Sequence, residues 1–272
     1  MTRRSALPGF APAMSVTMAW VGLIVLLPLA SLAARPWTMG FAGVWHSISE
    51  PRVLAALRLS FGAATLAAAI NVPLGLLIAW VMVRYRFPGR NLADSLIDLP
   101  LALPTAVAGI ALTALFSRRG WIGGWLALIG VKVDYTPLGI LVALIFVGLP
   151  FVVRTLEPVI VNLPLDAEEA AATLGASRGQ TIWRVVLPSL APALLAGFGA
   201  ALARGVGEYG SVIFIAGNMP MISEIAPLLI VIRLEQLDYA GAAALGLVML
   251  LVSFVILGLL NLLQARMARR PA

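Results

Sequence analysis

The sequence predicts an all-α polytopic membrane protein with about six transmembrane helices. Hydrophobic residues make up 61% of the 272 residues and charged residues only 11%, whereas a soluble domain carries about 25% charged residues. The mean hydropathy is +1.00, and several apolar runs approach the roughly 20 residues that a helix needs to cross the bilayer. No stretch has the polar face that a soluble domain requires, so we expect one membrane domain.

The composition also excludes several kinds of chemistry. The chain has no cysteine and one histidine, His46, which excludes disulfides, thiol nucleophiles and histidine-based metal clusters. Lys132 lacks the glycine-rich run of a phosphate-binding loop, so we expect no ATP site in this chain. We therefore expect no catalytic, cofactor-binding or metal site. The arginines stand at the ends of apolar runs, which favours membrane orientation over nucleic-acid binding.

The first span is predicted at Met14–Ala34, after a tail of residues 1–13 that contains Arg3 and Arg4. A signal peptide is the alternative, but its apolar core is only about 7–15 residues long. Residues 35–58 contain tryptophans typical of an interfacial loop outside the membrane. The N-terminus is then expected in the cytoplasm.

The second and third spans are predicted at Leu59–Val83 and Leu96–Phe116. Between them lies a cationic cluster that marks the cytoplasmic side, formed by Arg84, Arg86 and Arg90. Pro100 and Pro104 predict that the third span is bent or starts late. Residues 117–135 are expected to form an outside loop.

A fourth span at Leu138–Val153 precedes a polar loop, and a fifth span follows the loop from Leu190 or Gly197 to Ile215. The sixth is predicted at Gly241–Leu263. Between the last two spans, residues 225–234 are apolar but too short to cross, which predicts an interfacial or re-entrant helix. An even number of crossings places both termini in the cytoplasm. The membrane domain is then 14–265, with a C-terminal tail at 266–272.

The polar loop, Leu163–Pro188, reads like a piece of soluble protein. Asp166 is expected to cap a short helix that ends at Gly175 in a left-handed C-cap. Ser177 and Gln180 have the spacing of a capping box and open a second helix. Such a short helix is marginal alone, so a partner is expected to pack on it. The alternative is a capped cytoplasmic loop that only joins two spans.

The spacing of the loop resembles the EAA motif of permease subunits of ABC importers: Glu169-Ala170-Ala171, then Gly175, Val185 and Leu187-Pro188. In that family the segment is a cytoplasmic coupling helix that docks on a separate ATPase subunit. The resemblance therefore implies a type I ABC importer permease fold. It assigns ATPase coupling to Glu168, Glu169, Ala170, Ala171, Leu174, Gly175 and Arg178.

A second polar segment, Arg204–Ser211, lies inside the fifth apolar run. Its three glycines let helices approach closely or let the helix unwind, and either could serve a gate, so we call it the polar turn. Ionisable residues within a membrane face the bundle interior or an aqueous path. Arg204 and Glu208 are one helical turn apart, so they form either a neutralising pair or a pair whose arginine also meets a passing anion. Candidates for the translocation path or gate are Arg204, Glu208, Tyr209, Ser211, Asn218 and Thr105.

Four further segments resemble the T-type permease subunits of bacterial sulfate/thiosulfate importers, within the binding-protein-dependent (MetI-like) permease family. These are Leu103–Phe116, Gly148–Val159, Gly207–Asn218 and Ser223–Gly246. The resemblance implies a multi-pass subunit of the bacterial inner membrane. Its implied partners are a W-type second permease, a dimer of ABC ATPase subunits that bind ATP and Mg, and a periplasmic sulfate-binding protein. For residues 223–238, contact with that protein and a plain interfacial helix remain open.

Three alternatives remain. Related molybdate and tungstate permeases share the polar loop and the Gly-Glu-aromatic-Gly element of the polar turn. A secondary transporter driven by an ion gradient needs more intramembrane carboxylates than Glu208 alone. An intramembrane enzyme needs a paired nucleophile and base or two buried carboxylates, which the predicted spans lack.

Overall fold

The computed structural model describes residues 10–268, and all its regular elements within that range are helical. Most of the two expected tails, including Arg3, Arg4 and Arg269, lies outside the described residues. In chain order the elements are α1 (Phe10–Val21), η1 (Gly22–Leu26), α2 (Leu27–Ala34), η2 (Arg35–Met39), α3 (Gly40–Ser49), α4 (Pro51–Arg84), α5 (Arg90–Ala102), α6 (Thr105–Phe116), α7 (Trp121–Leu128), α8 (Pro137–Val161), α9 (Asp166–Thr173), α10 (Arg178–Thr181), η3 (Ile182–Val186), α11 (Leu187–Val206), α12 (Val212–Ile215), α13 (Ala226–Glu235) and α14 (Tyr239–Ala268).

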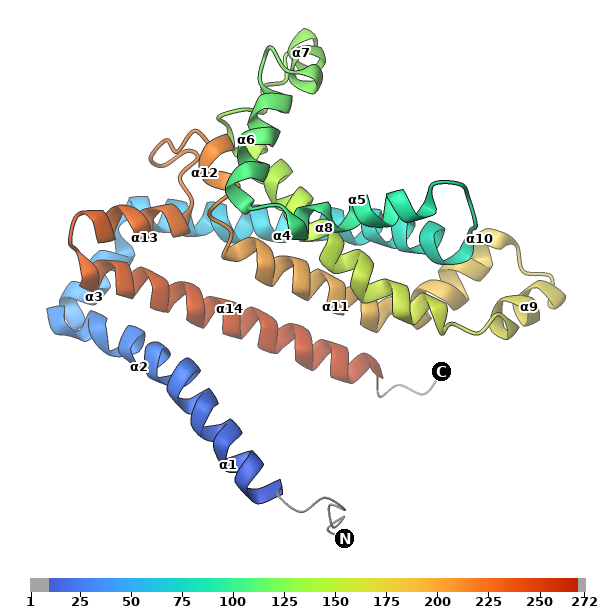
Figure 1. The fold of residues 1–272 in the computed structure, drawn as a ribbon, viewed down its shortest axis with the longest axis horizontal. Coiled ribbons are helices and arrows are strands. Elements are labelled where there is room, and N and C mark those ends of the chain that lie inside the picture. The colour runs from blue at the N-terminus through green and yellow to red at the C-terminus, as the bar shows by residue number, and fades with distance from the viewer. Residues whose placement is uncertain (1–9, 269–272) are drawn as a thin grey trace.

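Four long helices, α4, α8, α11 and α14, form the bundle, with α9 and α10 at one end and α3 and α13 at the other (Figure 1). The helices α4, α8 and α11 pack against one another. Glycines make this possible, because a Cβ on Gly75 or Gly197 would press against Val152 of α8. Small residues let helix backbones approach closely where lipid supplies no hydrophobic driving force.

The number of spans agrees with the prediction. Five helical segments in the described chain are long and apolar enough to cross a membrane: residues 12–49, 51–84, 137–161, 178–206 and 239–267. The pair α5 and α6 passes the same test but is bent by 112°. It makes the sixth span if the two halves are counted together. The first span lies away from the bundle at its N-terminal end (Figure 1), and none of its most apolar window is buried.

The bend between α5 and α6 occurs at Leu103 and Pro104, which both have extended backbone angles. A residue before proline avoids the helical region, so the helix ends there. The expected bend of the third span is confirmed. Arg154 of α8 holds α5 in place by donating to Asp98 at 2.8 and 2.6 Å and to Asp94 at 2.8 Å.

Two π-helical turns, η1 and η3, each come shortly before a proline. Pro28 and Pro188 have no N–H and would clash with the carbonyl four residues earlier in a regular helix. The wider π turn provides room for the ring. Residues 178–206 therefore form one helical segment that runs from the polar loop into the fifth span.

The two loops expected outside the membrane are largely helical, which corrects the prediction. Residues 35–58 form η2, α3 and the first turns of α4, and residues 117–135 contain α7. Aromatic and glycine residues had suggested irregular backbone there. However, the amphipathic α3 packs its Val44 inward while Trp45 stays exposed. The expected short helix at residues 225–234 is confirmed as α13.

The fifth span was predicted to reach Ile215, and this was wrong. Helix α11 ends at Val206, and Gly207–Ser211 forms an irregular turn before the single turn of α12. The apolar composition continues through this region, but glycines lower the helix propensity. The fold therefore has a break in the middle of an apolar run, at the polar turn.

Candidate functional site

Helix α9 of the polar loop ends in a hydrogen-bonded C-cap. Gly175 has φ of +82°, its N–H donates to the carbonyl of Ala172, and Ala176 N–H donates to that of Ala171, each at 3.0 Å. This is a Schellman motif, in which a left-handed residue favours glycine. The C-cap prediction is confirmed. The Asp166 cap is wrong, because Asp166 lies in the first turn and Leu165 is the N-cap, without a side-chain bond.

The second half of the polar loop has the predicted capping box. Ser177 Oγ accepts from Gln180 N–H, and Gln180 Oε1 accepts from Ser177 N–H at 2.8 Å. Arg178 begins α10 and is exposed. Because α10 continues through η3 into α11, one continuous helical segment joins the polar loop to the fifth span.

The surface of α9 is mostly open. Leu174 is 88% exposed, and Glu169 and Ala170 are exposed as well, while Ala171 is half-buried. Glu168 differs from its neighbour, because its carboxylate pairs with Arg84 of α4 at 2.9 Å. Leu174 is thus a single exposed leucine among small and charged residues, and no other part of this chain covers it.

The polar turn is organised around Glu208. Its side chain is 2% exposed and pairs with Arg204, one turn earlier in α11. Ser211 donates to Glu208 Oε1 from both its N–H and its hydroxyl, each at 2.9 Å. The predicted pair is confirmed. Arg204 keeps 30% of its side chain exposed, so the cation is partly open while the carboxylate is enclosed.

Helix α6 packs directly on this turn. A Cβ on Gly210 would collide with the Thr105 hydroxyl, and a Cβ on Gly109 would collide with the backbone of Ser211. The structure thus brings Thr105, Arg204, Glu208 and Ser211 together. Tyr209 is half-buried beside them.

Asn218 belongs to a different part of the molecule. It follows α12, has φ of +53°, and donates from Nδ2 to the Ile213 carbonyl at 2.8 Å. Its Oδ1 is buried without a partner. Asn218 therefore shapes the loop after α12 and makes no hydrogen bond to the polar turn.

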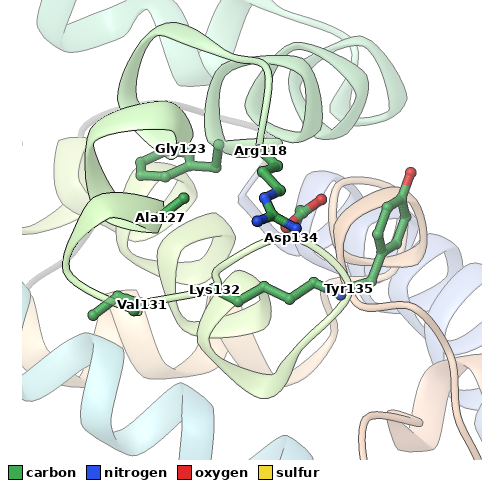
Figure 2. Close-up of a pocket in the computed structure, with 9 residues that line it drawn as sticks. Arg118, Gly123, Ala127, Val131, Lys132, Asp134 and Tyr135 are labelled. Carbon is green, nitrogen blue, oxygen red and sulfur yellow. The ribbon is translucent and has the colours of Figure 1, made fainter.

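A pocket of about 540 Å³ lies between α7 and the loop that follows it. Figure 2 shows Arg118 beside Asp134, with Lys132 and Tyr135 on the loop below. None of the predicted path residues lines this pocket. The pocket is formed by the end of α6, by α7 and by the loops on either side of α7.

Several ion pairs could not be anticipated from the sequence. Arg52 binds Glu224 through two hydrogen bonds of 2.8 and 2.7 Å, and Arg233 is 8% exposed and binds Glu50 at 2.9 Å. The two pairs join the start of α4 to the segment that contains α13, and Arg233 also donates to the Gly241 carbonyl of α14 at 3.1 Å. The structure shows helix α13 within residues 223–238, and both readings of this segment, a contact with a partner protein or a plain interfacial helix, stay predictions.

Residues 10–268 contain no cluster of three or more histidine, aspartate or glutamate side chains that could hold a metal ion.

The chain matches the family model of binding-protein-dependent transport system inner membrane components over residues 71–269. The match covers both the polar loop and the polar turn.

Curated relatives are similar over nearly the whole chain. The sulfate transport system permease protein CysT of Escherichia coli K12 is 47% identical over 270 residues, covering 99% of this chain and 98% of that protein. CysT of Synechococcus elongatus is 48% identical over 248 residues, covering 91% and 89%.

Solved structures of ABC importers share the fold. A bacterial alginate ABC transporter, in complex with a periplasmic protein bound to an alginate pentasaccharide, has a chain that matches with a TM-score of 0.76 at 19% identity, covering 96% of both chains. The MetNI methionine transporter in inward-facing conformations matches with a TM-score of 0.56 at 17% identity, covering 81% of this chain and 98% of that one.

Proposed function

Because the chain belongs to the family of binding-protein-dependent transport system inner membrane components, we propose that it is the permease subunit of an ATP-driven sulfate importer. The observation that carries this is 47% identity over 99% of the chain to a sulfate transport permease. The chain is a multi-pass inner-membrane subunit without ATPase activity of its own. Thiosulfate is the expected second substrate, because it is a tetrahedral dianion like sulfate.

The energy for transport then comes from other subunits. A dimer of ABC ATPase subunits binds ATP and Mg, a second permease of the W type completes the path, and a periplasmic sulfate-binding protein delivers the anion. The periplasmic partner is supported by the alginate transporter, whose structure includes a periplasmic protein. The ATPase partner is supported by the exposed surface of α9, where Leu174 is not covered by this chain.

Topology follows from the same proposal. The polar loop and the cluster of Arg84, Arg86 and Arg90 face the cytoplasm, in agreement with the positive-inside rule. Six crossings place both termini on that side. Residues 14–265 form one membrane domain. The structure describes one hydrophobic core cluster of buried residues within it.

Coupling proceeds through α9. When ATP closes the ATPase dimer, the subunit that holds α9 moves it, and the continuous helix from Arg178 to Val206 carries the motion to the polar turn. Helix α11 ends there, next to α6. A change of α11 relative to α6 opens or closes a path beside Arg204.

The polar turn is the proposed place where the anion meets protein charge. Sulfate is a dianion whose hydration must be replaced during crossing. Arg204, with 30% of its side chain exposed, supplies the cation, and the hydroxyl of Thr105 supplies a neutral donor. Glu208 holds the arginine in position from the enclosed side.

The experiment is ATP hydrolysis by the purified four-component complex in proteoliposomes. Sulfate-loaded binding protein is expected to stimulate hydrolysis severalfold over the empty protein, whereas molybdate at equal concentration is not. Stimulation by molybdate alone would reassign the cargo to molybdate or tungstate. Hydrolysis that ignores the binding protein, together with uptake that an ionophore abolishes, would contradict an ATP-driven importer.

A further inference from the structure

The polar loop has a second attachment to the bundle besides its own chain. Helix α9 packs against α10 and η3, which follow it directly. In addition, Nη2 of Arg84, the last residue of α4, donates to Glu168 Oε1 at 2.9 Å and to the Leu163 carbonyl at 3.4 Å. Arg84 thus contacts both the entry to α9 and its first turn.

The position of Arg84 is well defined. Its guanidinium lies over the ring of Trp80 at 5.1 Å from the ring centre. The side chains of Arg84 and Glu168 are only 18% and 26% exposed. An arginine in the last turn of a helix and a glutamate in the first turn of another both have favourable interactions with the helix dipoles. This arrangement is a shielded contact between two helix ends.

The two adjacent glutamates of α9 therefore point in different directions. Glu169 is exposed, as is Leu174, and these residues face the proposed ATPase subunit. Glu168 faces α4 of its own chain instead. The partner contact and the contact to the bundle lie on different sides of the same short helix.

We propose that Arg84 is a positioning residue of transport, which joins α4 to the coupling helix through Glu168. This inference rests on the proposed function. Without the pair, motion of α9 reaches the bundle through its chain connections to α8 and α10. With the pair, the same motion also acts on α4, which packs against both α8 and α11. The three core helices then move together when α9 is displaced.

The test compares sulfate transported per ATP hydrolysed in proteoliposomes with the complete complex. R84Q and E168Q are each expected to assemble and hydrolyse ATP, but to transport severalfold less sulfate per ATP, because motion of α9 then no longer acts on α4. R52Q/E224Q is the matched control, because Arg52 and Glu224 form a similar pair at the other end of α4, and removing both charges leaves no lone buried carboxylate. It is expected to keep the wild-type ratio.

A covalent replacement separates coupling from folding. The chain has no cysteine, so the two thiols of R84C/E168C can be joined as mixed disulfides by a short bis-methanethiosulfonate linker, with two sulfinates as leaving groups. A thiol reductant then cleaves both disulfides and releases the cysteines in the same preparation. The linked form is expected to recover the wild-type ratio, and the reduced form to lose it. Equal ratios in both forms, or wild-type ratios in R84Q and E168Q, would overturn the inference. Wild-type complex without ATP-dependent uptake would instead contradict the proposed function.

Discussion

Replacing Leu174 by aspartate is expected to abolish ATP-dependent transport while leaving the fold of this chain intact. The side chain is 88% exposed, so its loss removes no packing within the chain. At the proposed ATPase interface the change removes about 1.5–3 kcal/mol of leucine burial and adds a carboxylate that must lose water. Affinity for the ATPase subunit is expected to fall by at least about a hundredfold, since 1.4 kcal/mol is a factor of ten. Co-purification of the ATPase subunit and sulfate uptake measure both effects.

Leu128 provides the matched control, because it is 78% exposed and lies on α7, far from α9. L128D is expected to retain the ATPase subunit. The midpoint of thermal unfolding in detergent should be unchanged in both variants. If L174D still co-purified with the ATPase subunit and transported sulfate, the docking role of α9 would be wrong.

The double substitution R204Q/E208Q is expected to keep the fold but to lower sulfate uptake at least about tenfold, which corresponds to about 1.4 kcal/mol. Removing both charges leaves no lone ion in the bundle, and a glutamine at position 208 retains an oxygen that accepts from Ser211. The cation proposed to meet the anion is nevertheless lost. Initial uptake rates at saturating binding protein measure the effect, with ATPase co-purification as the check on assembly.

The single substitution E208A serves as the comparison. It leaves Arg204 unpaired and removes the acceptor for Ser211, which is 0% exposed. The remaining Arg204 is 30% exposed, so water screens part of its charge, but the buried Ser211 donors are left without an acceptor. E208A is therefore expected to lower the thermal midpoint and the yield of folded protein. A stable R204Q/E208Q variant with full uptake would show that the pair only packs the bundle.

Several features that depend on neighbouring residues were predictable from the sequence, although the Asp166 cap, which is equally local, was wrong. Gly175 adopts the left-handed conformation and Ser177 forms the capping box, because both depend on side chains within a few residues of chain. The bend at Pro104 follows from local sterics in the same way. Its size of 112° does not, since that angle depends on where α6 packs against the polar turn.

Features that depend on distant residues were not predictable. Arg84 had been read only as a mark of the cytoplasmic side, and its partner Glu168 is 84 residues away. Asn71 is fully buried and donates to the Ile145 carbonyl of α8 at 3.1 Å, a contact that no local pattern reveals. The glycines of the polar turn had left unwinding of the helix open, but the end of α11 at Val206 was not placed, because apolar composition continues beyond it. Hydropathy measures lipid compatibility and does not detect such a break.

Uptake of labelled sulfate into proteoliposomes that contain this chain, its second permease, the ATPase dimer and the binding protein separates an ATP-driven importer from a transporter driven by an ion gradient. Uptake is expected to require ATP on the side of the membrane that carries the ATPase subunits. It is expected to continue in the presence of an ionophore and to be inhibited little by molybdate. Uptake that proceeds without ATP and collapses with the ionophore would contradict the account.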